Sequence, residues 1–135
     1  PVLRRIARYA DAWVPHSSAT PEMVERDWAV IERVAPEFGR KAADIGVVYS
    51  NFVHVLGQGE RPEAAAARFA TFSGMDLDYW REHYLLGEAE AVAERITRRI
   101  AAVGGRVDWV VLNPVDWDSE QLERLAAEVL PRVSG

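Results

Sequence analysis

Three strand-like segments alternate with helical segments along this chain, and this alternation constrains the fold more than any other feature. The strand-like segments are residues 12–14, 45–56 and 107–112. The longest is rich in valine and aromatic residues, which favour strands. The last contains the apolar run 109–112, which is typical of a strand that is covered on both faces. Strands separated by helices pair in parallel, so the sequence predicts an α/β fold with about three parallel strands and flanking helices.

Apolar residues at helical spacing predict the elements between the strands. Thr20-Pro21-Glu22 is a strong helix start, because a capping residue precedes a proline at the first helical position and an acid in the first turn. Asp118 and Gln121 have the spacing of a capping pair at the start of the last helix. The predicted helices lie at 3–10, 21–38, 61–73, 76–84, 88–103 and 119–130, so that helices precede, separate and follow the three strands.

The length of 135 residues suits one domain, but it leaves two architectures open. Three parallel strands form a poor isolated sheet, because both outer strands present unpaired backbone groups. A complete eight-stranded barrel takes about 250 residues, roughly twice this length. The chain is therefore either a small open α/β domain or part of a larger barrel.

Composition and charge exclude several classes of protein. The net charge of −5 gives no electrostatic attraction to nucleic acid, so we expect no nucleic-acid partner. The absence of cysteine excludes disulfides, thiolate metal sites and a cysteine nucleophile. No apolar run approaches the roughly 20 residues that span a bilayer, and no targeting signal opens the sequence. We expect a cytoplasmic protein that does not contact membranes.

Four stretches, in order, resemble the luciferase-like monooxygenases, which are flavin- or F420-dependent oxidoreductases. They are residues 3–13, 38–47, 86–93 and 104–114, with departures at Ala12, where the family has glycine, and at Lys41-Ala42, where it has Asp-Pro. The resemblance implies that residues 1–135 are a single C-terminal portion of a (β/α)8 TIM barrel. It also implies FMN or coenzyme F420 as cofactor and a small-molecule substrate of the whole enzyme. The family's phosphate-binding Gly-Gly pair would come just before residue 1, so we expect this portion alone to bind cofactor weakly.

Three polar residues are the candidate cofactor-binding residues, because such barrels carry their reacting groups at the C-terminal ends of strands. They are His16, Asn51 and Asn113. Each has a simpler alternative: a solvated loop histidine, an amide satisfied by its neighbours, and a turn residue before a proline. No catalytic residue is assigned. The three histidines are too scattered to indicate a metal site, and we predict none.

Other motifs favour structural roles. Gly57-Gln58-Gly59 lacks the third glycine of a nucleotide-binding loop and predicts a turn. Trp28 and Trp109 are expected in the core. The aromatic helix around Trp80 is expected to form an interface, because aromatic residues are enriched at interfaces.

Two functions from different classes remain open. One is a portion of a luciferase-like oxidoreductase or monooxygenase that binds FMN or F420. The other is a non-catalytic half-barrel that self-associates as a homo-oligomer or complements a partner chain, because its sheet edges need cover.

Overall fold

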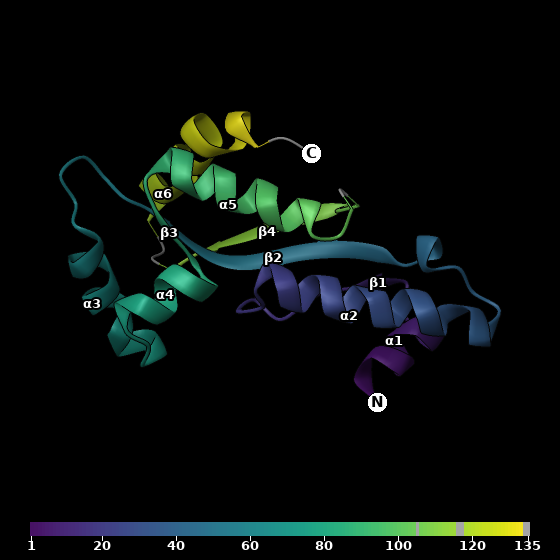
Figure 1. Cartoon of the computed structure of the whole chain (residues 1–135). Helices are drawn as coiled ribbons and strands as arrows, with labels where there is room; N and C mark the ends of the chain where they lie inside the picture. Colours follow the sequence, from purple (N-terminus) through teal and green to yellow (C-terminus); the bar gives the residue numbers. More distant parts are fainter. Residues whose placement is uncertain (105, 116–117, 134–135) are drawn as a thin grey trace. The chain divides into compact units, whose positions relative to one another are not determined.

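The computed structural model describes residues 1–104, 106–115 and 118–133, with side chains at all of these except 71–73. The described part of the chain divides into two compact units, of residues 1–50 with 98–111 and of residues 51–97 with 112–133. Strands β2 and β4 and helix α5 each run from one unit into the other. Figure 1 shows β2 as one long strand.

The first unit begins with a helix, a very short strand and a long helix, as the sequence predicts. Thr20 caps the long helix, because its side-chain oxygen accepts a hydrogen bond from the amide of Met23 at 3.4 Å. Pro36 falls in a single 3-10 turn that ends the helix, and Gly39 follows it at φ +70°. The elements are α1 (Val2–Tyr9), β1 (Ala12–Trp13), α2 (Pro21–Val34), two 3-10 turns (Ala35–Phe38 and Ala42–Asp44) and the start of β2 (Gly46–Val55).

A stacked tryptophan pair lies in the core of the first unit. The rings of Trp13 and Trp28 lie 5.8 Å apart between centroids, and both side chains are buried. Strand β1 pairs in parallel with β2, with Trp13 opposite Val47. Asp108 fixes the same point of β2, because its amide donates to the Val47 carbonyl and its carboxylate accepts from the Val47 amide at 2.7 Å.

The second unit is built on the end of β2. Strand β3 pairs with it in parallel, from Val53 opposite Leu85 to Val55 opposite Gly87. The amide of Val115, just after β4, donates to the Val53 carbonyl, whereas the amide of Asp108, just before β4, donates to the earlier Val47 carbonyl, so β4 runs in the same direction as β2. The remaining elements are α3 (Pro62–Ser73), α4 (Leu77–His83), β3 (Leu85–Gly87), α5 (Ala89–Ala101), β4 (Trp109–Pro114), α6 (Ser119–Arg124), a π turn (Leu125–Val129) and a 3-10 turn (Leu130–Arg132).

The predicted parallel α/β fold class is confirmed, with one strand more than expected. Strand β3 has three residues, which is too short for its periodicity to distinguish it from the loop before α5. The turn predicted at Gly57-Gln58-Gly59 is present, with Gly59 at φ +76°.

The prediction that the helix around Trp80 forms an interface is wrong. Trp80 is only 1% exposed, and Tyr84 is also buried. Trp80 lies in α4 and packs against Phe69 with ring centroids 5.2 Å apart, and Tyr84, the residue after α4, packs against Trp80 at 4.7 Å. Trp80 and Tyr84 therefore belong to the core of the second unit.

The prediction that the last strand is covered on both faces is also wrong for this chain. Trp109 is 71% exposed, Val110 38% and Val111 43%. These consecutive residues point alternately to the two faces of a strand, so apolar surface is exposed on both. Trp28 is in the core as predicted, whereas Trp109 is not.

Candidate functional site

Asn51 is the most unusual of the three predicted site residues. It lies in the middle of β2 and is fully buried. Its amide nitrogen donates to the carbonyl of His83 at 3.2 Å. Its side-chain oxygen Oδ1 is buried and accepts no hydrogen bond from any described residue. A buried acceptor without a partner costs free energy, on the order of 1–3 kcal/mol, so this atom calls for an explanation.

Asn113 lies close to Asn51. It is the fifth residue of β4, and its amide nitrogen donates to the backbone carbonyl of Asn51 at 3.3 Å. The two asparagines, 62 positions apart in sequence, are therefore brought together in the second unit. Asn113 is half-buried, so part of its side chain stays accessible.

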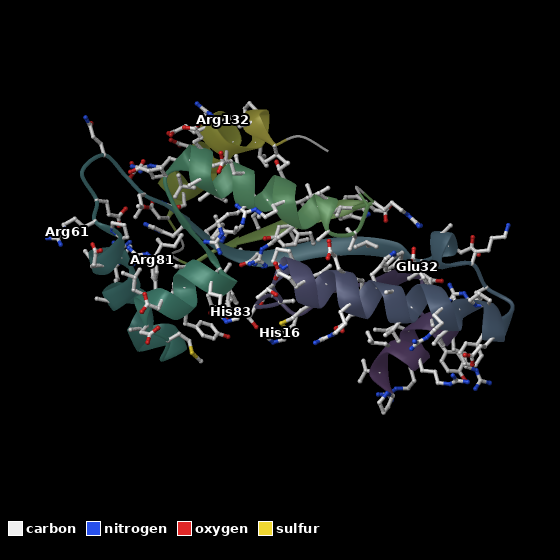
Figure 2. The ribbon with its side chains drawn as sticks, viewed as in Figure 1. His16, Glu32, Arg61, Arg81, His83 and Arg132 are labelled. Carbon is white, nitrogen blue, oxygen red and sulfur yellow. The ribbon has the colours of Figure 1, made fainter. Side chains whose placement is uncertain are left out.

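His16 lies in the first unit, in the loop that leads from β1 into α2 (Figure 2). It is exposed, and its ring nitrogen Nδ1 lies 2.7 Å from the Ser18 hydroxyl oxygen. Its position after a strand end agrees with the prediction. Its contribution to cofactor binding stays a prediction.

Gln121 is a buried polar residue whose role the sequence did not indicate. We predicted it as the partner of Asp118 in a capping box, which is wrong. Asp118 caps α6 alone, accepting from the amide of Glu120 at 2.9 Å. The Gln121 side chain instead makes two hydrogen bonds to the backbone of Val55. Its oxygen Oε1 accepts from the Val55 amide at 2.8 Å, and its nitrogen Nε2 donates to the Val55 carbonyl at 2.9 Å. The side-chain amide thus takes the place of a neighbouring strand at the end of β2.

A cluster of polar and charged side chains holds the loop that follows β2. Nε2 of His54 lies 3.0 Å from Oε2 of Glu60, and Oε1 of Glu60 lies 3.1 Å from Nη2 of Arg68. The Gly57 amide also donates to Glu60, at 2.9 Å. An ionised carboxylate only accepts hydrogen bonds, so Nε2 of His54 carries the proton. His54 is buried edge-on against Phe69, 4.9 Å between ring centroids, so the cluster holds the loop rather than contacting a ligand.

This cluster predicts a loss of stability in acid. Burial raises the pKa of Glu60, but the Gly57 amide, His54 and Arg68 together outweigh burial and hold this pKa below its ordinary 4.5. Ionised Glu60 therefore contributes stability above about pH 4.5, and this contribution is lost as pH falls through the lowered pKa. We expect Glu60→Gln to lower the free energy of unfolding at pH 7 by about 1 kcal/mol. Urea unfolding should show a smaller difference from wild type at pH 3.

The exposed Glu63→Gln on α3 is the matched control, because it makes the same chemical change outside the cluster. We expect little effect from it at either pH. A Glu60→Gln effect of equal size at both pH values would contradict the role given to the ionised carboxylate.

A pocket of about 620 Å³ lies beside the end of β2 in the second unit. Among the described residues, four glutamates and one arginine line it, and this arginine, Arg124, is paired with a glutamate one helical turn earlier, Glu120. The net charge of this lining is negative, so it repels a phosphate group. The pocket therefore does not suit the anionic part of a cofactor.

The described residues contain neither a metal-binding cluster nor a helix that could cross a membrane. No three histidine or acidic side chains come together in a metal-ligating arrangement in this part of the chain. None of the helices it contains has both the length and the apolar character of a membrane span.

The residues present fit a flavin-like ring in one respect. Oδ1 of Asn51 is an acceptor without a partner among the described residues, and a ring N–H is the kind of donor that would satisfy it. The side chain has no exposed surface, so this contact requires a neighbouring side chain to move. Asn113 lies beside it and is half-buried, so its side chain is less enclosed than that of Asn51.

Comparison with known sequences gives no family assignment. No family model matches the sequence. No curated protein matches it either.

Comparison with solved structures finds likenesses over nearly the whole chain. An F420-dependent secondary alcohol dehydrogenase in complex with an F420-acetone adduct has a TM-score of 0.74 at 17% identity, over 98% of this chain and 46% of its own. The coenzyme F420 dependent tetrahydromethanopterin reductase of Methanopyrus kandleri has a TM-score of 0.72 at 19% identity, over 98% of this chain and 48% of its own.

A third likeness is to a type II Baeyer-Villiger monooxygenase, the oxygenating constituent of 3,6-diketocamphane monooxygenase from the CAM plasmid of Pseudomonas putida, in complex with FMN. Its TM-score is 0.62 at 17% identity, over 99% of this chain and 46% of its own. The chain thus spans less than half the length of each of these three structures. The α/β fold of this chain is therefore the fold of the corresponding part of these three structures, as the resemblance to luciferase-like monooxygenases predicts.

Proposed function

We propose that residues 1–135 are the C-terminal portion of an F420- or FMN-dependent oxidoreductase of the luciferase-like kind, acting in the cytoplasm on a small-molecule substrate. The observation that carries the proposal is the partnerless Oδ1 of Asn51, in a fold shared with structures that contain F420 or FMN. A buried polar atom that nothing in the described chain satisfies fits a group supplied from outside.

The cofactor would supply the redox chemistry, and this chain would bind and orient it. Asn51 would accept a hydrogen bond from a ring N–H through Oδ1, while its amide nitrogen stays bonded to His83. Asn113 would support this geometry, because it holds the Asn51 carbonyl and so fixes the backbone that carries the acceptor.

Cofactor titration of the 135-residue chain tests the proposal. We expect FMN or F420 to bind in a saturable way, followed by the fluorescence of the cofactor. Asn51→Leu, which keeps the side-chain volume and removes the acceptor, should weaken binding about tenfold, as expected for one lost hydrogen bond of about 1.4 kcal/mol. Gln58→Leu is the matched control, because it makes a similar amide-to-leucine change at an exposed position just after β2.

Two results would contradict this assignment. One is the absence of saturable binding of either cofactor by the wild-type chain up to the solubility of the cofactor. The other is equal binding by wild type and Asn51→Leu, which would leave the proposed acceptor without a role.

A second candidate function is favoured by the exposed strand β4. A non-catalytic half-barrel that pairs with a second copy of itself, or with a separate partner chain, would cover Trp109, Val110 and Val111. Apolar strands with free backbone groups are ready to pair with another strand. Purified protein that is colourless, tightly associated and indifferent to added FMN and F420 would favour this function over the first.

A further inference from the structure

Two side chains from other elements of the second unit hold the end of helix α4. The last carbonyls of a helix have no partner within the helix, and α4 ends at His83 (Figure 2). Nη2 of Arg95, on α5, donates to the carbonyl of Glu82 at 3.2 Å. The amide nitrogen of Asn51, on β2, donates to the next carbonyl, that of His83, also at 3.2 Å. Side chains therefore satisfy two successive carbonyls at this helix end.

The bond to His83 decides what the Asn51 side chain offers to a ligand. A carbonyl can only accept, so the end of the Asn51 amide that faces His83 is its nitrogen. The other end is the oxygen Oδ1, which is buried and has no partner among the described residues. A rotation that exchanged the two ends would present a donor in place of this acceptor. The His83 carbonyl thus fixes Asn51 as an acceptor, which selects a ligand N–H or O–H.

The bond from Arg95 opposes fraying of the same helix end. Helix α4 has seven residues, and so short a helix is marginal without support from other elements. Local opening begins at such helix ends. The Glu82 carbonyl lies one peptide group before the His83 carbonyl, so an opening at Glu82 moves the acceptor that orients Asn51. A hydrogen bond from an arginine is charge-assisted and stronger than a neutral one, so Arg95 holds this turn firmly.

We propose that Arg95 is a positioning residue of the cofactor site. It holds the Glu82 carbonyl, so that the His83 carbonyl keeps the Asn51 amide turned with Oδ1 free to accept from a ring N–H of FMN or F420. The proposal rests on the proposed function, because it concerns the same acceptor atom. Arg95 acts through the helix end and makes no contact with the cofactor.

The first experiment needs no cofactor. Hydrogen exchange of the Asn51 side-chain amide protons is measured by NMR in wild type, Arg95→Met and Arg98→Met. Arg98 is an exposed arginine on the same helix, so its variant loses the same charge and keeps the bond to Glu82. We expect the Asn51 protons to exchange about fivefold faster in Arg95→Met, because the helix end opens more often. Arg98→Met should match wild type, and Arg95→Lys, which keeps a charged donor, should restore part of the protection.

Two results of the exchange experiment would overturn the role of Arg95. One is unchanged exchange of the Asn51 side-chain protons in Arg95→Met. The other is faster exchange of equal size throughout the second unit, because that pattern means a general loss of stability. The Val55 amide, which donates to Gln121 at 2.8 Å, is the reference for the rest of the unit, and we expect it to keep its wild-type rate.

The second experiment tests whether Arg95 acts on the cofactor through Asn51. FMN and F420 are titrated into wild type, Arg95→Met, Arg98→Met, Asn51→Leu and the double variant of Arg95→Met with Asn51→Leu. We expect Arg95→Met to bind about fivefold more weakly than Arg98→Met. The same exchange should have no further effect in the Asn51→Leu background, where the acceptor is already absent. A fivefold loss that persists in this background would overturn the proposal, because Arg95 would then act by another route.

Cofactor binding by wild type distinguishes an error about Arg95 from an error about the proposed function. Equal binding by Arg95→Met and Arg98→Met, while wild type binds the cofactor, would overturn the role of Arg95 alone. The absence of saturable binding by wild type would contradict the proposed function, and the role of Arg95 with it.

Discussion

Gln121→Leu should lower the free energy of unfolding by about 2–4 kcal/mol, the largest loss of stability we expect from one exchange of similar volume. The side chain of Gln121 is buried and bonds to both backbone groups of Val55, which is itself fully buried. Leucine can replace neither bond, so one N–H and one C=O are left unsatisfied. Each such group costs about 1–3 kcal/mol, and the added burial of leucine offsets only part of the sum.

Urea unfolding at pH 7 measures this effect, with the exposed Gln58→Leu as the control for the amide-to-leucine change. Gln121→Glu gives a second test. Its ionised carboxylate can accept from Val55 but cannot donate to it, whereas the protonated acid can do both. Its stability relative to wild type should therefore rise as the pH is lowered. A loss below about 0.5 kcal/mol for Gln121→Leu would mean that the backbone of Val55 finds other partners.

Trp109→Lys with Val111→Lys should convert an associated protein into a monomer. Trp109 and Val111 are two positions apart, so they lie on the same face of β4, and both are exposed. A tryptophan buried at an interface is a frequent hot spot, and a lysine in the same place brings an uncompensated charge. We expect the dissociation constant for self-association to rise at least about 100-fold, equivalent to about 2.7 kcal/mol.

Sedimentation velocity of wild type and variant at equal concentration measures this change. Leu122→Lys on α6 is the control, because it introduces the same charge at another exposed apolar residue, outside β4. If the control dissociates the protein as much as the double variant does, association does not depend on β4. If the double variant stays associated, the account of this strand is wrong.

Periodicity and turn chemistry were sufficient to predict most of the elements. The valine-rich segment became β2, and Thr20-Pro21-Glu22 became a capped helix start, because both patterns act locally. Strand β3 was missed because three residues carry no measurable period. It exists through its pairing with β2, in which Val53 lies opposite Leu85, and sequence reasoning cannot supply that register.

Burial was harder to predict than secondary structure. Trp80 and Trp109 are the same residue type in apolar surroundings, yet one is 1% exposed and the other 71%. The difference depends on which element lies opposite each side chain. Trp80 has Phe69 of α3 within reach, whereas Trp109 has no described residue that covers it.

The sequence predicted which strands carry the candidate site residues, but not the contacts that these residues make. The sequence placed Asn51 and Asn113 on two parallel strands, and the structure brings them together through the Asn51 carbonyl. That Oδ1 of Asn51 lacks a partner follows from the packing around it, which no sequence pattern describes. Gln121 was misassigned because its spacing from Asp118 is that of a capping pair. Its hydrogen bonds to the backbone of Val55 depend on where β2 lies, which the sequence does not show.

The mass of the wild-type chain in solution tests most directly the proposal that another polypeptide covers the exposed strand β4. Sedimentation equilibrium should be run from low to high micromolar concentration on the 135-residue chain alone. The account predicts an average mass that rises above the monomer value with concentration, as a second copy covers Trp109 and its neighbours. A single monomeric species over the whole range, with no binding of a hydrophobic dye, would contradict it.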